Sequence, residues 1–386
     1  MITFEHVTKR YRGGTLAVDN LDLEIPAGKT VVLVGPSGCG KTTSLRMINR
    51  LIEPSEGRIL LDGKDIHESN PATLRRGIGY VIQQTGLFPH RTIEDNIATV
   101  PLLNGWRKAR ARERARELMR LVGLDEAMAR RYPHQLSGGQ QQRVGVARAL
   151  AADPPVLLMD EPFSAVDPIV RASLQDELLR LQDELHKTIV LVTHDVEEAI
   201  KVGDLVAVFR PGGVLAQVDT PERLLGKPAD DYVEGFVGFD RGIRRLSFFD
   251  AAGLDLAFDA IATADTAAAD AAVAAKRAGE SWVLVTDGQR RPTGWAAIDQ
   301  LEAAPATTRV ADLPLVSYGH TFRPAANSLR AALDATVLSP TGRAVGVDED
   351  GTVIGVTSYD RLRAAIQAAQ EAADQPQPPQ AGGRAS

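Results

Sequence analysis

Apolar and polar positions follow two different patterns along the chain, and the change comes near residue 240. Before it, short apolar runs such as TVVLV at 30–34 and VLLM at 156–159 alternate with helical patterns. Continuous apolar runs that end in turns are typical of strands buried on both faces of a parallel sheet. The sequence therefore predicts an α/β domain over residues 1–237, with a parallel sheet flanked by helices.

An internal repeat follows a linker predicted at 238–245. VLVTDGQRRPTGWAAIDQL at 283–301 matches AVGVDEDGTVIGVTSYDRL at 344–362. Gly294 lies over Gly355 and Asp299 over Asp360, an offset of 61 residues in both cases (355 − 294 and 360 − 299). Each copy reads helix, strand, turn, strand, helix, and we expect the two units to bury their open faces against each other.

The predicted boundaries after the linker follow from this repeat and from composition. The first copy is placed at 246–302 and the second at 303–365. The ending EAADQPQPPQAGGRAS is polar and rich in proline. Such composition cannot bury a core, so residues 366–386 are predicted to be disordered.

Composition and charge exclude several classes of protein. The 44 basic and 50 acidic side chains leave a net charge of −6, which argues against a nucleic-acid binder because such proteins usually carry a basic face. Glutamates interleave the arginines of the helical pattern RKARARERARELMRLVGL, so it reads as a solvated face with an apolar underside. The start lacks an apolar secretory segment, and no apolar run approaches the roughly 18 residues that span a bilayer. With Cys39 as the single cysteine, we expect a soluble, cytosolic chain without disulfides.

The stretch GPSGCGKTT directly after the first apolar run has the spacing of a phosphate-binding loop (P-loop). Glycines let backbone N–H groups point at anionic oxygens, the lysine adds charge, and the threonine hydroxyl can ligate Mg²⁺. The following helix would direct its positive end at the same phosphates. The predicted phosphate-binding residues are Gly35, Pro36, Ser37, Gly38, Cys39, Gly40, Lys41, Thr42 and Thr43.

Two adjacent carboxylates end the second apolar run, in VLLMDEP. They lie at the carboxyl end of a predicted buried strand, where open α/β sheets bind their ligands. Asp160 is expected to hold Mg²⁺ directly or through water. Glu161 is then placed to polarise an attacking water as a general base.

A second anion-binding helix start is predicted by LSGGQQQR at 136–143. One ATP cannot easily contact both this motif and the P-loop of the same subunit, so we expect each subunit to complete its partner's site. At this point the chain resembles the ATP-binding cassette (ABC) ATPases, whose signature sequence this is. The resemblance implies that Ser137, Gly138, Gly139 and Gln140 contact the partner's nucleotide.

Four more positions match motifs of the ABC ATPases. Tyr11, in TKRYRGG, resembles the aromatic residue that stacks on adenine. Gln83, in GYVIQQTG, resembles the glutamine that reaches Mg²⁺ and the water while linking to a membrane partner. Asp167, in SAVD, resembles the acidic residue of the loop at the dimer interface, and His194, in LVTHD, the histidine that contacts the γ-phosphate.

The resemblance implies a P-loop ABC cassette, a RecA-like core plus a helical subdomain, that binds ATP and Mg²⁺. Two ATP molecules lie between two cassettes, and hydrolysis reopens the dimer. The catalytic set implied is Glu161, His194, Gln83 and Lys41, and the Mg²⁺ ligands implied are Thr42, Gln83 and Asp160.

Three uses of such a cassette compete: an importer subunit, a soluble cassette in DNA repair or translation, and an exporter. Translation-type relatives resemble two fused cassettes, and DNA-repair relatives carry long coiled coils or zinc sites. Exporters usually fuse membrane helices to the cassette. The chain has one cassette and none of these additions, which favours the importer subunit.

The segment GLFPHRTIEDNIATVPLLNGW at 86–106 narrows the importer class. It resembles the importers for quaternary-amine osmoprotectants, which carry glycine betaine, choline, carnitine or proline betaine. The C-terminal repeat resembles a tandem cystathionine-β-synthase (CBS) pair, the usual appendage of those ATPases. Importers for sulfate, maltose or polyamines typically end in a β-barrel, which alanine-rich helices do not suit. An importer for another small solute is the alternative.

The resemblance also implies partners and a location. The expected assembly is a homodimer of cassettes with membrane permease subunits and an extracytoplasmic substrate-binding protein. It would lie at the cytoplasmic face of the inner or plasma membrane. No nucleic-acid partner is expected.

The CBS repeat departs from its family at the positions that hold ribose. Members that bind adenosine show a threonine and, three residues on, an aspartate. The first copy has Ala297 and Gln300 there, and the second has Ser358 and Arg361. AMP or ATP is therefore not expected to bind in the usual way, whereas cyclic di-AMP or anionic lipid remains open as the signal.

Overall fold

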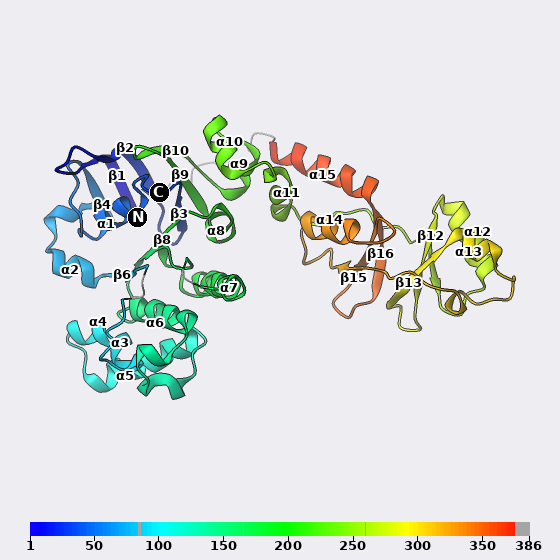
Figure 1. The fold of residues 1–386 in the computed structure, drawn as a ribbon, viewed down its shortest axis with the longest axis horizontal. Coiled ribbons are helices and arrows are strands. Elements are labelled where there is room, and N and C mark those ends of the chain that lie inside the picture. Colours follow the sequence, from blue (N-terminus) through cyan, green and yellow to red (C-terminus); the bar gives the residue numbers. More distant parts are fainter. Residues whose placement is uncertain (84–85, 165, 259, 375–386) are drawn as a thin grey trace, which may run out of the picture. The chain divides into compact units, whose positions relative to one another are not determined.

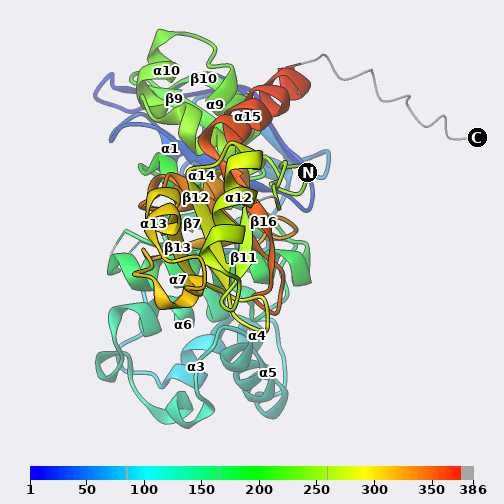
Figure 2. The same ribbon diagram turned by 90° about the vertical axis from the view of Figure 1, so that its right-hand side faces the viewer.

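The chain divides into two units, Met1–Phe239 and Asp240–Ser386. The computed structural model describes residues 1–83, 86–164, 166–258 and 260–374, and Figures 1 and 2 show their helices and strands. In these ranges no helix is both long and apolar enough to cross a membrane.

The main sheet of unit 1 has six strands within the described ranges, in the order β10-β9-β3-β8-β7-β6. Strands β9, β3, β8, β7 and β6 run parallel, and β10 pairs antiparallel with β9. Every residue of β3, β7 and β8 is buried, so the apolar runs do form the predicted parallel sheet. The bounds are β3 Thr30–Val34, β6 Ile78–Val81, β7 Val156–Asp160, β8 Thr188–Thr193, β9 Leu205–Arg210 and β10 Val214–Asp219.

A second, antiparallel sheet in unit 1 has the order β2-β1-β4-β5. Alternate residues of β2 are buried, as expected when one face of a strand meets a core. That core contains Phe4 of β1, Leu33 of β3 and Leu45 of helix α1 (Lys41–Ile48), so α1 joins the two sheets. The strands are β1 Ile2–Arg10, β2 Leu16–Ile25, β4 Glu56–Leu61 and β5 Lys64–Asp65.

The remaining helices of unit 1 form a helical lobe and a cover for the main sheet. Figure 1 shows the lobe, α3 to α6, gathered apart from α1. The arginine-rich helix α5 buries Ala111, Ala115, Leu118 and Met119, and its outward Arg116 pairs with Glu94. The bounds are α2 Pro71–Arg76, α3 Ile93–Ile97, α4 Thr99–Leu103, α5 Lys108–Leu121, α6 Gly138–Leu150, α7 Pro168–Leu185, α8 Val196–Val202, α9 Pro221–Gly226 and α10 Asp231–Val237, with short 3₁₀ turns η1 Ile66–Glu68, η2 Glu126–Arg130 and η3 Pro133–Gln135.

Unit 2 contains the predicted repeat as two three-stranded sheets, β11-β12-β13 and β14-β15-β16. The offset of 61 residues superimposes β12 (Trp282–Thr286) on β15 (Arg343–Val347) and β13 (Pro292–Ala297) on β16 (Val353–Ser358). Each copy has the predicted order helix, strand, turn, strand, helix. The other elements are β11 Ile261–Thr263, α12 Ala268–Ala278, α13 Ile298–Ala303, η5 Val310–Asp312, β14 Thr321–Phe322, α14 Leu329–Val337 and α15 Tyr359–Asp374.

The two copies interlock through the segments ahead of their first helices. Ala257, ahead of α12 in the first copy, bridges to Val356 in β16, and Val316, ahead of α14 in the second copy, bridges to Trp295 in β13. Leu284 and Trp295 share one core with Val345. The copies therefore bury their open faces against each other, as predicted.

The predicted linker 238–245 contains the division between the two units, after Phe239. It also contains helix α11 (Arg241–Arg245), in which Arg244 pairs with Asp240, and the 3₁₀ turn η4 (Leu246–Phe248) follows it. One predicted boundary, that of the tail, is wrong. The predicted disordered tail begins later than residue 366, because α15 continues to Asp374. Its Ile366 and Ala369 pack on the core of the second copy, one and two turns after the buried Leu362. Residues 375–386 lie outside the described residues.

Candidate functional site

The P-loop connects β3 to α1, and its shape depends on glycine. Gly40, the N-cap of α1, has φ 95°. A Cβ there would lie 2.1 Å from the carbonyl oxygen of Ala17. Gly38 also has positive φ, 79°. The loop can therefore curl around an anion at the start of α1 only because these positions lack a side chain.

Lys41 lies at the centre of this loop and is 5% exposed. Its Nζ donates to the carbonyl oxygens of Gly35 at 2.7 Å and Pro36 at 2.8 Å. These neutral acceptors hold the ammonium where phosphate oxygens could replace them. The structure thus places the predicted charge inside the predicted loop.

Tyr11 lies beside the P-loop with its ring accessible. The residue is 41% exposed, and its hydroxyl lies 3.4 Å from Thr43 Oγ1. Lys9 Nζ lies 5.4 Å from the ring centroid. The arrangement leaves an aromatic surface next to the loop that a flat base could cover.

Asp160, at the end of β7, is 2% exposed and joins three segments. Its Oδ1 accepts a hydrogen bond from Thr42 Oγ1 at 2.9 Å. Its Oδ2 is 3.4 Å from Arg46 Nη2 and 3.5 Å from the Tyr80 hydroxyl. The two carboxylate oxygens are therefore contacted by helix α1 and by the neighbouring strand β6.

Sequence reasoning missed Arg46 and Tyr80. Arg46 lies four residues after Thr42 on α1, which places both side chains on one face of the helix. Tyr80 is paired with Leu158 in the ladder between β6 and β7. The helical spacing was a usable signal for Arg46, but only the strand order could reveal Tyr80.

The two side chains that contact Asp160 Oδ2, Tyr80 and Arg46, both have a raised pKa. Burial raises the pKa of Tyr80, and the charge of Asp160 raises it further. The hydrogen bond to Tyr80 is the largest cause that raises the pKa of Arg46. At neutral pH the Tyr80 phenol therefore keeps its proton and can donate a hydrogen bond to the Asp160 carboxylate.

Glu161 contacts two of the other predicted site residues, Gln83 and His194. Its Oε2 accepts from Gln83 Nε2 at 2.9 Å, and its Oε1 lies 3.4 Å from His194 Nδ1. The backbone of Glu161 has φ 46°, an uncommon conformation for a residue with a side chain. Its N–H donates to the Val192 carbonyl of β8 at 2.9 Å. This strained turn holds the carboxylate between the ends of β6 and β8.

The oxygen donors at this edge of the sheet fit Mg²⁺. Mg²⁺ prefers oxygen ligands, keeps several waters, and is usually held by one or two carboxylates together with substrate phosphates. Thr42 and Asp160 are in contact, and Gln83 reaches the residue after Asp160. The described residues contain no cluster of three or more His, Cys, Asp or Glu that could hold a metal.

The signature motif begins helix α6 with a capping box. Ser137 Oγ accepts from the Gln140 N–H at 3.3 Å, and Gln140 Oε1 accepts from the Ser137 N–H at 3.0 Å. A Cβ on Gly139 would lie 2.8 Å from Val170 Cγ1 of α7. Gly138 is the first residue of the helix.

The structure does not bring the signature helix beside the P-loop helix within the chain. Helix α6 packs on α3, α5 and β6, whereas α1 packs on β2, β7 and β8. Figures 1 and 2 both show α1 among the strands and α6 in the helical lobe. Asp167 caps α7 by accepting from the Ile169 N–H at 2.9 Å. Ala165 of the same predicted interface loop lies outside the described residues.

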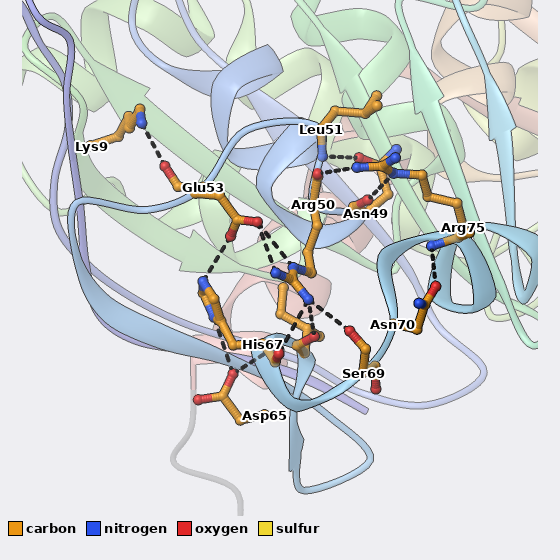
Figure 3. A network of polar contacts seen from close by, with 12 residues as sticks. Lys9, Asn49, Arg50, Leu51, Glu53, Asp65, His67, Ser69, Asn70 and Arg75 are labelled. Atoms are coloured by element: carbon orange, nitrogen blue, oxygen red, sulfur yellow. Dashed lines mark hydrogen bonds and ion pairs between the residues drawn. The ribbon is translucent and has the colours of Figure 1, made fainter.

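A polar network fixes the far end of α1 (Figure 3). Arg50 has φ 55°, and its guanidinium donates to Glu53 Oε1 and to the Ile66, His67 and Ser69 carbonyls. Glu53 Oε2 lies 2.7 Å from His67 Nε2. Arg75 of α2 donates to the Asn49 and Arg50 carbonyls. A cation thus contacts the carbonyls of Asn49, the C-cap of α1, and of Arg50, the next residue, which suits the negative end of a helix.

A groove of about 270 Å³ lies beside β6, and we call it the β6 groove. Arg75, Tyr80, Phe88, Val100, Ala152 and Arg148 are among its lining residues. Phe88 and Val100 belong to the 86–106 segment that the sequence singled out. The groove therefore joins that segment to the strand that precedes Gln83.

Unit 2 has a small cavity between its two copies. It measures about 20 Å³, little more than one water molecule needs. Ser358 and Arg361 line it, whereas Ala297 and Gln300 are not among its lining residues. Trp295 Nε1 and Thr357 Oγ1, also at the cavity, are buried without a hydrogen-bond partner. A nucleotide would require this cavity to widen.

Comparison with known proteins gives consistent matches. A sequence model described as ABC transporter matches residues 18–164. The osmoprotectant import ATP-binding protein OsmV of Salmonella typhimurium is 47% identical over 371 residues, which cover 94% of this chain and 95% of that protein. The choline transport ATP-binding protein OpuBA of Bacillus subtilis is 56% identical over 247 residues, 64% of this chain and 65% of that protein.

Solved structures match the first unit. The dimeric bacterial ABC transporter cassette MJ0796 has a TM-score of 0.53 and 37% identity, over 57% of this chain and 99% of that one. The same cassette, in a dimeric post-hydrolysis state bound to ADP and Pi, gives a TM-score of 0.53 and 36% identity.

Proposed function

The chain belongs to the ABC transporter family as an ATP-binding subunit, and from this premise we propose that its ATP hydrolysis drives the uptake of quaternary-amine osmoprotectants. Glycine betaine, choline, carnitine and proline betaine are the candidate solutes. The observation that carries the proposal is the alignment over 94% of the chain with a relative named as an osmoprotectant importer subunit. The choline transport relative supports the same chemical class.

The site residues take complementary roles in this proposal. Tyr11 stacks on adenine, and the P-loop N–H groups from Gly35 to Thr43 bind the phosphates. Lys41 exchanges its two carbonyl acceptors for phosphate oxygens. Thr42, Asp160 and Gln83 would hold Mg²⁺, which supplies further positive charge against the phosphates.

Glu161 is the proposed general base. Its carboxylate accepts from Gln83 and faces His194, so three side chains from three strand ends surround one position for water. Glu161 takes a proton from that water while His194 and Gln83 orient it toward the γ-phosphate. Positioning and electrostatic stabilisation supply most of the rate in such reactions.

The second half of each site is proposed to come from another subunit. Ser137, Gly138, Gly139 and Gln140 lie in the helical lobe and not beside α1, so a partner cassette must supply them. The dimeric cassette among the structural matches supports this arrangement. Asp167 would then lie at the dimer interface.

The same proposal includes further partners and a location. The β6 groove is a suitable seat for a segment of a membrane permease subunit, because it combines the 86–106 segment with the strand leading to Gln83. An extracytoplasmic substrate-binding protein would deliver the solute. The subunit would lie peripherally at the cytoplasmic face of the inner or plasma membrane.

Unit 2 is proposed to be a regulatory CBS pair. The support is its duplicated helix–strand–turn–strand–helix order and the interlocking of the copies. The narrow cavity with Arg361 at its wall does not favour AMP. Cyclic di-AMP and anionic lipid are the two signals to be compared.

Uptake by cells that lack this subunit tests the substrate class. Loss of the gene should abolish uptake of labelled glycine betaine or a related quaternary amine under osmotic stress, while sugar uptake continues. Restoring the wild-type chain should restore uptake, and restoring E161Q should not. Unchanged osmoprotectant uptake, in a strain without a redundant importer, would point to another small solute.

A further inference from the structure

Tyr80 lies between the β6 groove and the buried carboxylate of Asp160. Tyr80 lines the groove together with Phe88 and Val100. Its hydroxyl lies 3.5 Å from Asp160 Oδ2 and donates to it. One residue therefore borders both the groove and the proposed Mg²⁺ site.

Arg46 of helix α1 contacts the same carboxylate oxygen as this tyrosine. Its Nη2 lies 3.4 Å from Asp160 Oδ2. The other carboxylate oxygen accepts from Thr42 Oγ1. The orientation of Asp160 thus depends on three side-chain contacts, and Tyr80 makes one of the two at Oδ2.

Arg75 provides a second link from the groove to α1. It lines the groove and donates to the carbonyl oxygens of Asn49 and Arg50 at the end of that helix (Figure 3). Its neighbour Arg76 also lines the groove, but it donates to the Leu103 carbonyl and to Thr73 Oγ1. The two arginines therefore form a matched pair, of which one reaches α1.

We propose that Tyr80 is a positioning residue through which a group seated in the β6 groove changes the placement of Asp160, and with it the Mg²⁺ requirement of the nucleotide site. The proposal rests on the proposed ATP- and Mg²⁺-binding function, but not on the identity of the transported solute. Removing the hydroxyl keeps the ring and takes away one of the two side-chain contacts of Asp160 Oδ2. The carboxylate must then be ordered when the cation binds, so more Mg²⁺ is required.

The first test is a Mg²⁺ titration of the full chain carrying Y80F. At fixed ATP, the Mg²⁺ concentration for half-maximal hydrolysis should rise about twofold to tenfold, the range expected for one typical intramolecular hydrogen bond. Binding of the fluorescent analogue TNP-ATP in EDTA should stay unchanged. The control Y359F removes the hydroxyl of an exposed tyrosine in unit 2 and should leave both measurements unchanged.

Two results would overturn the assignment. One is a Y80F titration that superimposes on that of the parent chain. The other is an equal loss of Mg²⁺ response and of Mg²⁺-free TNP-ATP affinity, which would indicate general damage to the fold. If the parent chain hydrolysed no ATP, the proposed function would fail. The Mg²⁺ dependence of TNP-ATP binding would still compare Y80F with its parent.

The second test fills the groove deliberately. The one native cysteine, Cys39, is 1% exposed, so a bulky maleimide should label A152C in the groove selectively. The label should shift the Mg²⁺ midpoint in the parent chain and shift it much less in Y80F. The same label on A127C, at an exposed position of the helical lobe, should have no effect. Equal shifts in the parent and Y80F backgrounds would show that the groove reaches the site by another route.

The arginine pair completes the test. R75Q, which breaks the contact with the Asn49 and Arg50 carbonyls just after α1, should also raise the Mg²⁺ midpoint. R76Q should leave it unchanged, although it removes the same charge from the same helix. Equal effects of R75Q and R76Q would mean that groove charge, and not contact with α1, determines the response.

Discussion

The two units of this chain use the aspartates that end their strands in opposite ways. In unit 1, Asp160 ends β7, and its carboxylate accepts from Thr42 on another segment. In unit 2, Asp287 and Asp348 follow β12 and β15 at equivalent positions of the repeat. Asp287 accepts from the backbone N–H groups of Gln289 and Arg291.

Asp348 repeats this pattern, because it accepts from the N–H groups of Asp350 and Thr352. Both aspartates of unit 2 therefore close their own turns through Oδ1. In this chain, the aspartate at a strand end that is proposed to bind a ligand is the one whose carboxylate is contacted by a distant segment. That difference gives predictions that separate the units.

The largest expected effect is on hydrolysis. E161Q keeps the size of the side chain but cannot accept a proton from water, so turnover should fall by about 10²–10⁴. ATP binding should survive, and gel filtration with ATP and Mg²⁺ should show a persistent dimer. D348N in unit 2 is the control and should hydrolyse at the parental rate. Parental turnover in E161Q would show that Glu161 is not the base.

A next effect concerns the two helix starts of unit 1. K41A should weaken nucleotide binding, whereas S137R should leave binding intact and block hydrolysis by obstructing the partner's site. A mixture of the two variants can form at most one complete site per dimer. Full two-site activity in the mixture, measured as phosphate release, would contradict sites shared between subunits.

The third prediction concerns the stability of unit 2. Trp295 is 1% exposed and belongs to the core that joins the two copies, so W295A should cost about 3–5 kcal/mol of unfolding free energy. Urea unfolding should show an early transition for unit 2, while the ATP-dependent stabilisation of unit 1 is kept. A loss of ATP-dependent stabilisation in W295A would show that unit 1 does not fold independently.

The smallest expected effect on hydrolysis comes from removing unit 2. A chain that ends at Phe239 keeps every motif from Tyr11 to His194 and should hydrolyse ATP at close to the parental rate. Reconstituted in vesicles with its permease, it should lose the response of transport to internal salt or to cyclic di-AMP, since a regulatory unit acts only by binding one state better. An unchanged response to both would place the sensor elsewhere.

Much of the fold could be predicted because local sequence dictates it. The run TVVLV is typical of a strand buried on both faces and forms one, and the repeat offset of 61 residues carries over to β12, β13, β15 and β16. The helical end of α15 was missed because alanine and glutamine hide a narrow apolar face. That face is formed by Leu362, Ile366 and Ala369, which are four and three residues apart.

The candidate site was predictable where motifs carry the geometry, and not where packing does. The sequence indicated Thr42, Asp160 and Glu161 from their spacing and their place at strand ends. The contacts of Arg46 and Tyr80 with Asp160 depend on β6 lying next to β7. Strand order is a property of the whole sheet, so no local pattern contains it.

The crossed bridges of unit 2 restrict how this chain can be divided. Each copy pairs with a segment of the other copy, at Ala257 and Val316. One copy expressed alone would keep an open sheet edge, and an identical molecule could fill that edge by exchanging the same segment. Gene duplication would turn such an exchanged pair into one polypeptide, so the cut that yields a soluble fragment lies before residue 240 and not between the copies.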